Sequence, residues 1–399
     1  MHKPIIYQML PRIWGNDKSS PVKGGTLSEN GTGKFSDIDK NTLEYLKWLG
    51  CSHVWYTGIL RHSTQASEAG CTPSHPQFVK GKAGSPYAIC DYYDVNAYLA
   101  DDPANRMGEF EDLLKRSHEA GLKVIIDFVP NHVARQYESD AKPEGVIDLG
   151  QDDQKEYAFS NQNNFYYIPG ESLHGNIDLH MNAPEPYEEM PAKATGNDKF
   201  DAWPGINDWY ETVKLNYGID YVNGRTCHFY PTPDTWNKMR DILFFWASKG
   251  IDGFRCDMAC EMPFDFWKSV IPSIRKDYPQ MYWLAEGEHT ELHNGSFDAS
   301  YAWELHHLLN AIARGEKGVA ELKEYIAKDA AAHPAEAFRL MFTSNHDENS
   351  WAGTEFERMG DAAKVMAMLT FTLPNGQPLI YTGQEMGWNK RFEFFEKDH

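Results

Sequence analysis

Four short segments decide the fold of this chain: DFVPNH (127–132), GFRCD (253–257), WLAE (283–286) and FTSNHD (342–347). Each closes an apolar run, typical of a buried strand, with acidic or histidine residues at its carboxyl end. In a parallel α/β barrel all strands end at one face, where catalytic groups collect. We therefore predict that these polar residues converge on one site although they lie far apart in the sequence.

Runs typical of strands and of helices alternate around these segments. The strands are expected at 4–10, 52–56, 122–128, 252–256, 282–285, 339–343 and 378–381. The helices are expected at 39–50, 109–120, 236–248, 264–276, 304–314 and 362–371. Repeated strand-then-helix units indicate a parallel sheet with right-handed crossovers. Because there are about eight strand candidates, we predict an α/β fold with a closed TIM (β/α)8 barrel. A doubly wound sheet is the alternative.

The stretch from Val133 to Thr235 is too long for a simple connection between a strand and a helix. It is rich in Asn, Asp, Pro, Gly and Tyr, which favours irregular structure. We predict a barrel made of residues 1–132 and 236–399, with residues 133–235 as an irregular subdomain inserted between strand 3 and helix 3. A second long loop, from Gly58 to Pro86, is expected on the same face.

Composition limits the partners and the compartment. The chain has 399 residues, 41% of them hydrophobic, and a formal net charge of −20. Such an acidic surface repels phosphate groups, so we expect neither nucleic acid nor a membrane as a partner. The start, MHKP (1–4), lacks the apolar centre of a signal peptide, and we expect a cytoplasmic protein unless a signal has been removed. The six cysteines lack metal-binding spacing, which favours free, buried thiols. The oligomeric state is left open.

The motifs resemble the catalytic part of the α-amylase family of glycoside hydrolases. The resemblance runs from IYQMLPR (6–12) to PLIYTGQE (378–385) and includes GSPY (84–87) and DYYDV (91–95). All four segments quoted above occur in the order and spacing of that family, with a long insertion after the first. The resemblance implies a retaining enzyme that acts on α-glucosidic bonds.

The resemblance assigns roles to three carboxylates. Asp257 matches the nucleophile, Glu286 the general acid/base, and Asp347 the third carboxylate, which holds sugar hydroxyls near the transition state. Arg255 lies two residues before Asp257 on the same strand face, and we expect its charge to keep Asp257 ionised. The apolar residues before Glu286 favour a raised pKa, as a proton donor requires. Taken singly, each residue would more often be a structural ion pair, a cap or a turn.

The resemblance also assigns binding residues. His132 and His346 match histidines that donate hydrogen bonds to sugar hydroxyls, and Tyr87 matches an aromatic ring that stacks on the sugar. Asp127 matches a structural position. Many members hold a structural calcium ion at the position of Asn131, and an oxygen-rich site suits calcium. A structural calcium ion is therefore an open expectation, with no cofactor required for the chemistry.

Other positions depart from the family pattern. Met258, Cys260 and Glu261, which follow the nucleophile, match no variant with a clear preference for one linkage. The chain ends at His399, soon after the eighth strand, whereas the family normally continues with a last helix and a β-sandwich. We therefore expect the C-terminal β-sandwich to be absent and the chain to be truncated.

Three functions follow from these observations. The first is retaining hydrolysis of α-glucosidic bonds, α-1,4 bonds above all, in starch-like glucans or maltooligosaccharides. The second is transglycosylation or an α-1,6 preference on the same scaffold. The third is a non-catalytic sugar-binding protein, which is less expected because such relatives usually lose a carboxylate and this chain keeps all three.

Overall fold

The structure, a computed structural model, describes residues 3–18, 22–67, 72–174 and 185–392. Within them, parallel strands form a closed barrel in the order β1-β16-β15-β14-β13-β12-β5-β2. These are β1 Ile6–Met9, β2 His53–Tyr56, β5 Lys123–Phe128, β12 Gly253–Cys256, β13 Tyr282–Ala285, β14 Ala299–Tyr301, β15 Phe338–Met341 and β16 Gly376–Tyr381. The predicted TIM barrel is confirmed, and the doubly wound alternative is wrong because β1 pairs with both β2 and β16.

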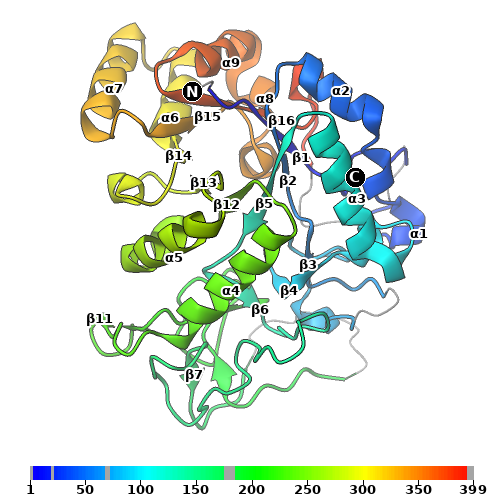
Figure 1. The fold of residues 1–399 in the computed structure, drawn as a ribbon, viewed down its shortest axis with the longest axis vertical. Helices are drawn as coiled ribbons and strands as arrows, with labels where there is room; N and C mark the ends of the chain where they lie inside the picture. Colours follow the sequence, from blue (N-terminus) through cyan, green and yellow to red (C-terminus); the bar gives the residue numbers. More distant parts are fainter. Residues whose placement is uncertain (1–2, 19–21, 68–71, 175–184, 393–399) are drawn as a thin grey trace.

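Helices surround the barrel (Figure 1). They are α1 Leu27–Asn30, α2 Lys40–Trp48, α3 Arg106–Glu119, α4 Asp234–Ser248, α5 Phe264–Asp277, α6 Trp303–Ala313, α7 Val319–Ala332, α8 Glu355–Met359 and α9 Ala363–Thr372. Apolar residues at helical spacing explain their packing: α5 buries Phe266, Val270 and Ile274 along one face. At the start of α2, the Asp39 carboxylate accepts a hydrogen bond from the Thr42 amide at 2.8 Å, as an N-cap does.

Strand β14 and helix α7 are among the elements that the sequence missed. Strand β14 contains only three residues, Ala-Ser-Tyr, and has no apolar run of its own. It is recognisable only by its neighbours, because Ala299 pairs with Leu284 on β13 and with Phe338 on β15. A strand this short is specified by the gap that the closed barrel leaves for it.

Alternate residues of each barrel strand face opposite sides. On β5, Val124, Ile126 and Phe128 pack outward into the large core beneath the helices, whereas Ile125 joins the core inside the barrel. Inside positions near the carboxyl ends hold polar groups, including the fully buried side chain of Arg255 on β12. This alternation places the functional side chains inside the barrel mouth.

In its described residues, the connection between β5 and α4 contains only short strands: β6 His132–Ala134, β7 Tyr167–Ile168, β8 Ala192–Lys193, β9 Thr212–Lys214, β10 Ile219–Asp220 and β11 Thr226–Cys227. They form the two-stranded sheets β6–β9, β7–β8 and β10–β11. Figure 1 shows β6, β7 and β11 together below α4 and α5. The long loop after β2 forms a further pair, β3 Leu60–His62 with β4 Ile89–Val95. The subdomain boundaries and the absence of a C-terminal β-sandwich stay predictions.

None of the helices in the described residues combines the length and the apolar surface that crossing a bilayer requires. Of the cysteines, Cys51, Cys90 and Cys256 are free and buried, as predicted, but Cys227 and Cys260 are free and exposed. Cys227 lies in the short strand β11, and Cys260 lies in a single 3-10 turn formed by residues 259–261. Cys71 lies outside the described residues.

Candidate active site

The carboxyl ends of β5, β12 and β13 bring Asp127, Asp257 and Glu286 together. These strands are neighbours, with Arg255 opposite Asp127 and Cys256 opposite Ala285 in the parallel register. Asp257 and Glu286 each follow the last residue of their strands, so adjacent strand ends carry them. The sequence prediction that residues 257 and 286 lie on consecutive strands is confirmed.

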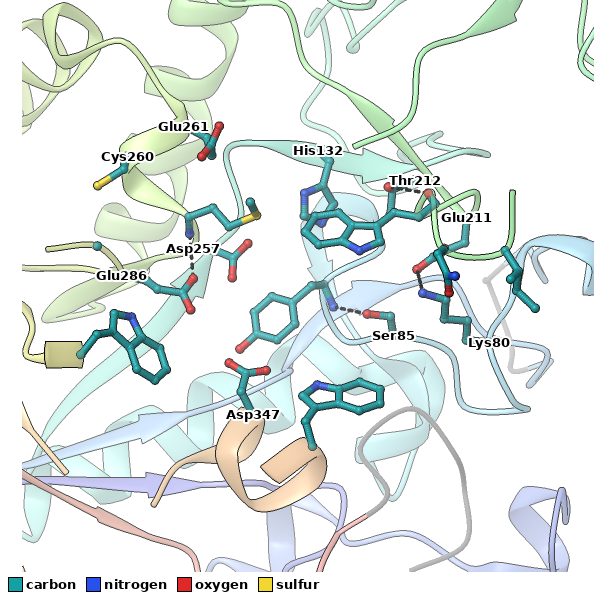
Figure 2. A pocket seen from close by; sticks show the side chains of 18 residues that line it. Lys80, Ser85, His132, Glu211, Thr212, Asp257, Cys260, Glu261, Glu286 and Asp347 are labelled. Atoms are coloured by element: carbon teal, nitrogen blue, oxygen red, sulfur yellow. Dashed lines mark hydrogen bonds and ion pairs between the residues drawn. The ribbon is translucent and has the colours of Figure 1, made fainter. Parts of the chain in front are cut away.

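A cavity of about 610 Å³ opens at this face of the barrel. Five of the residues predicted from sequence line it or its floor: Tyr87, His132, Asp257, Glu286 and Asp347. Figure 2 shows Asp257, Glu286 and Asp347 in the middle of the cavity, with His132 nearby. The structure therefore brings together groups that lie between positions 87 and 347 of the chain.

Arg255 connects the carboxylates. Its Nη1 donates a hydrogen bond of 2.7 Å to Asp257 and one of 3.3 Å to Asp127, and its Nη2 lies 2.8 Å from Glu286 Oε1. The guanidinium is fully buried, and three aromatic rings lie 5.2–5.6 Å from it, those of Trp55, Tyr87 and Tyr301. A buried cation among several carboxylates is held in place, and its removal would leave uncompensated negative charge.

Burial sets the protonation of the carboxylates. Burial raises the pKa of Asp257 to about 6, although the Arg255 charge lowers it. Arg255 acts in the expected direction, because its charge lowers the pKa, but removal from water outweighs the ion pair. Asp257 is still mostly ionised at pH 7. Burial likewise raises the pKa of Glu286 to about 7, with the Asp257 charge adding to the shift and Arg255 opposing it. That direction agrees with the sequence prediction.

Asp347 is the third carboxylate of the cavity. Burial and the Glu286 charge raise its pKa to about 7. Asp347 and Glu286 therefore compete for protons, and their titration belongs to the pair and not to either residue alone. A proton can be held in the cavity near neutral pH, as acid catalysis by a carboxyl group requires.

Met258 fixes the orientation of Glu286. Its backbone lies in the left-handed region, with φ +46°, which is uncommon for a residue other than glycine. In this conformation the Met258 amide donates a hydrogen bond of 2.8 Å to Glu286 Oε2. The Ala259 amide donates to the Glu286 carbonyl at 2.9 Å. The strained turn after Asp257 therefore holds the neighbouring carboxylate in a single position.

The predicted binding residues lie at different depths. Tyr87 lines the cavity, and its hydroxyl is 2.8 Å from His346 Nε2. His346 is fully buried, 3.2 Å from Asp347 Oδ2, and so contacts the cavity lining. Burial lowers the pKa of His132 to about 3 and that of His346 well below its usual value, so both rings are neutral. The hydrogen bonds to sugar expected of these residues stay predictions.

Comparison with known proteins shows the family of the chain. The sequence profile described as "Alpha amylase, catalytic domain" matches residues 26–398. The chain belongs to the α-amylase family. "Alpha-amylase MalA" of Haloarcula japonica is 24% identical over 366 residues, which cover 91% of this chain and 43% of that protein. "Cyclomaltodextrinase" of Geobacillus thermopakistaniensis is 23% identical over 397 residues, covering 96% of this chain and 53% of the relative. The chain spans about half the length of these relatives.

The fold is also that of solved members of the family. An α-amylase from Lactobacillus plantarum superposes with a TM-score of 0.66 at 22% identity, over 99% of this chain and 74% of that one. A maltogenic α-amylase, AmyB, from Thermotoga neapolitana gives a TM-score of 0.63 at 21% identity, over 99% of this chain and 70% of that one.

The calcium position of the family holds a lysine in this chain. Lys214 on β9 is buried, and its Nζ donates a hydrogen bond of 2.6 Å to Asn131 Oδ1. The same Nζ lies 2.8 Å from Asp198 Oδ1. A divalent cation at the Asn131 oxygen would meet the ammonium charge, so these residues do not fit calcium there. Among the described residues, no group of three or more His, Cys, Asp or Glu side chains is placed to hold a metal ion.

Sequence reasoning missed several residues of the cavity wall. Both long loops shape it, as predicted, but the individual side chains were not foreseen: Lys80, Ile206, Trp209, Glu211, Trp303 and Trp351. Most come from irregular segments with no strand or helix pattern. The nearest indication in the sequence was the number of tryptophans, 12, and composition does not separate wall residues from core residues.

Proposed function

We propose that this member of the α-amylase family hydrolyses α-1,4-glucosidic bonds in starch-like glucans or maltooligosaccharides, with retention at the anomeric carbon. The observation that carries the proposal is the arrangement of Asp257 and Glu286 on adjacent strand ends, both in contact with the buried Arg255. Two carboxyl groups on either side of the scissile bond are what retaining glycosidases use.

In the proposed reaction, Asp257 attacks the anomeric carbon while Glu286 gives its proton to the glycosidic oxygen, and the leaving sugar departs. A covalent glycosyl–Asp257 ester remains. Glu286, now ionised, then takes a proton from water as the water oxygen attacks the same carbon, and Asp257 is released. Each proton given to the leaving group is thus recovered from water. Asp347 holds sugar hydroxyls and stabilises the positive charge that develops on the ring.

The environment of each carboxyl group supports its proposed role. Asp257, with the lower of the two pKa values and a direct hydrogen bond from Arg255, is ionised, as a nucleophile must be. Glu286, with its pKa raised to about 7, keeps a proton in part of the molecules at neutral pH.

The test is the release of reducing sugar from maltoheptaose by the wild-type chain and by Asp257→Asn. The substitution keeps the shape of the side chain and removes the nucleophilic charge, so we expect a loss of about 10³-fold or more in kcat. Unchanged thermal unfolding would show that the variant is folded. Equal rates for the two proteins would overturn the proposal.

Product analysis tests the finer parts of the proposal. Panose contains both α-1,4 and α-1,6 bonds, and we expect cleavage at the α-1,4 bond. Products longer than the substrate would instead mean that a sugar hydroxyl replaces water, which is transglycosylation. Tight binding of maltoheptaose without turnover would favour a non-catalytic sugar-binding protein.

Calcium independence is part of this proposal. Its support is the Lys214 ammonium, which lies 2.6 Å from Asn131 Oδ1 and 2.8 Å from Asp198 Oδ1 and would repel a divalent cation there. We expect that excess EDTA leaves both the thermal unfolding midpoint and the activity unchanged. A midpoint that falls with EDTA and recovers with added Ca²⁺ would contradict the assignment of this position to Lys214.

A further inference from the structure

An ion pair lies on the opposite side of the cavity from the general acid. Lys80, in the loop before β4, and Glu211, just before β9, both line the cavity, and Lys80 Nζ lies 2.7 Å from Glu211 Oε1. Figure 2 shows this pair on one side of Asp257 and Asp347, with Glu286 and Cys260 on the other. The two sides of the cavity are therefore chemically different.

The Glu211 side chain is not fully satisfied by the protein. It is only 5% exposed, and its second oxygen, Oε2, is buried without a hydrogen-bond partner among the described residues. An ionised carboxylate removed from water normally accepts hydrogen bonds on both oxygens. A small rotation about the last side-chain bond, a broad torsion, would turn Oε2 toward a donor in the cavity. The Lys80 side chain is 30% exposed and can donate there.

The pair is held at a fixed place relative to the sugar-binding residues. The Glu211 carbonyl accepts a hydrogen bond of 2.8 Å from the Arg135 amide, where strands β6 and β9 run side by side. His132 begins β6, and its ring lies 5.4 Å from that of Trp209, two residues before Glu211. Lys80 is close enough to His132 for its charge to contribute to the lowered pKa of that ring.

The direction of the substrate follows from the proposed reaction. The proton of Glu286 goes to the leaving oxygen, so the leaving sugar lies on the Glu286 side. The glycosyl unit that Asp257 retains must then lie toward His132 and Tyr87, and the next unit of the glucan continues toward Lys80 and Glu211.

We propose that Lys80 and Glu211 bind the hydroxyls of the second glycosyl unit on the retained side of the scissile bond, and so select substrates with at least two units there. This inference rests on the proposed function. The ammonium donates and the carboxylate accepts, which matches neighbouring hydroxyls that each do both. Lys80 and Glu211 are specificity-determining residues and take no part in bond cleavage.

A purely structural ion pair would behave differently. If Lys80 and Glu211 only tied the loop before β4 to β9, their loss would lower stability and affect all substrates alike. If they bind the second unit, their loss affects only substrates that have one.

The experiment compares 4-nitrophenyl α-maltoside, which can place two units on the retained side, with 4-nitrophenyl α-glucoside, which has one. For Glu211→Gln and Lys80→Met we expect kcat/KM on the maltoside to fall by about 10-fold to 100-fold, the effect of losing a hydrogen bond to a charged group. We expect kcat/KM on the glucoside to change by less than about 2-fold, because this substrate has no second unit for Lys80 and Glu211 to contact. Released 4-nitrophenol measures both.

Lys142→Met is the matched control. Lys142 is 32% exposed and lies 3.8 Å from Asp148, whose side chain is 9% exposed, and neither residue lines the cavity. We expect both substrates to react with this variant as with the wild type. Equal losses on maltoside and glucoside in Glu211→Gln and Lys80→Met, or no loss, would overturn the inference.

Failure of the proposed function gives a different result. In that case the wild-type chain would release 4-nitrophenol from neither substrate. Calorimetry with maltotriose would then decide the inference: weaker binding by Glu211→Gln than by the wild type supports the contact, and equal binding refutes it.

Discussion

The floor and the rim of the cavity are built in different ways. The floor consists of Asp257 and Glu286 at the ends of barrel strands, and Arg255 and the Met258 amide hold both in fixed positions. The rim consists of side chains outside the barrel strands: Lys80 and Glu211 lie in long connections, and the exposed Trp351 lies in the helical turn of residues 348–352.

From this difference we infer that the floor carries out the reaction and that the rim selects the substrate. Strand ends are rigid and lie at defined spacings, so they suit groups that must meet a reacting bond within a few tenths of an ångström. Loops vary in length and sequence with little effect on the barrel, so they suit contacts that select the substrate. Changes to the floor should therefore alter rate and stability, and changes to the rim should alter substrate preference.

The largest expected effect concerns the proton donor. Glu286→Gln should lower kcat on maltoheptaose by about 10²–10⁴-fold, the usual contribution of general acid catalysis. The loss in kcat/KM, which reports the steps up to departure of the leaving group, should be smaller on 2,4-dinitrophenyl α-maltoside, because that leaving group departs without a proton. Steady-state rates on both substrates measure this, and equal losses would contradict the role of Glu286 as the acid.

Arg255 should be the residue of the floor on which stability most depends. Arg255→Met leaves Asp127, Asp257 and Glu286 buried without their common cation and should lower the free energy of unfolding by about 3–5 kcal/mol. These carboxyl groups would then have pKa values still further above those of the unfolded chain. The loss should therefore grow as pH rises from 5 to 8.

Urea unfolding at both pH values measures the Arg255 effect. Arg314→Met is the control, because the Arg314 side chain forms an exposed ion pair, 2.8 Å from Glu316. That variant should unfold like the wild type. An Arg255→Met loss that shrinks as pH rises would rule out this electrostatic account.

The pH dependence of kcat/KM should be bell-shaped. Below about pH 6 the rate should fall because Asp257, with its pKa raised to about 6, takes up a proton and loses its nucleophilic charge. Above about pH 7 it should fall because Glu286, with its pKa raised to about 7, loses the proton that it donates. Each limb should approach a 10-fold change for one pH unit. An alkaline limb that persists in Glu286→Gln would assign that limb to another group.

The smallest effect is expected at the rim. Trp351 is 66% exposed and lines the cavity, where its ring can contact a sugar face. Trp351→Ala should raise KM for maltoheptaose by about 3-fold to 10-fold with little change in kcat. Trp48→Ala removes a ring that is 79% exposed on α2, outside the cavity lining, and should change neither constant. A fall in kcat with unchanged KM for Trp351→Ala would place this residue with the floor.

Much of the floor could be predicted because strand ends combine a local pattern with a fixed geometry. The run GFRCD (253–257) is recognisable from its own sequence as the end of a strand. Arg255 and Asp257 lie on the same strand face because side chains two residues apart point to the same side. The contact between Arg255 and Glu286 was not foreseen, because it joins two strands and depends on their register. The raised pKa of Asp257 was not foreseen, since sequence reveals the arginine but not the depth of burial.

The amino-acid sequence by itself determined the barrel, its strand-end motifs and its family, because apolar periodicity and short motifs are local properties of the chain. Tertiary structure alone decided which side chains line the cavity, how burial shifts the carboxyl groups, and that the Lys214 ammonium reaches Asn131 across 83 positions of the sequence. Those features depend on the packing of loops without a repeating pattern and on exclusion of water, and both arise only once the chain has folded.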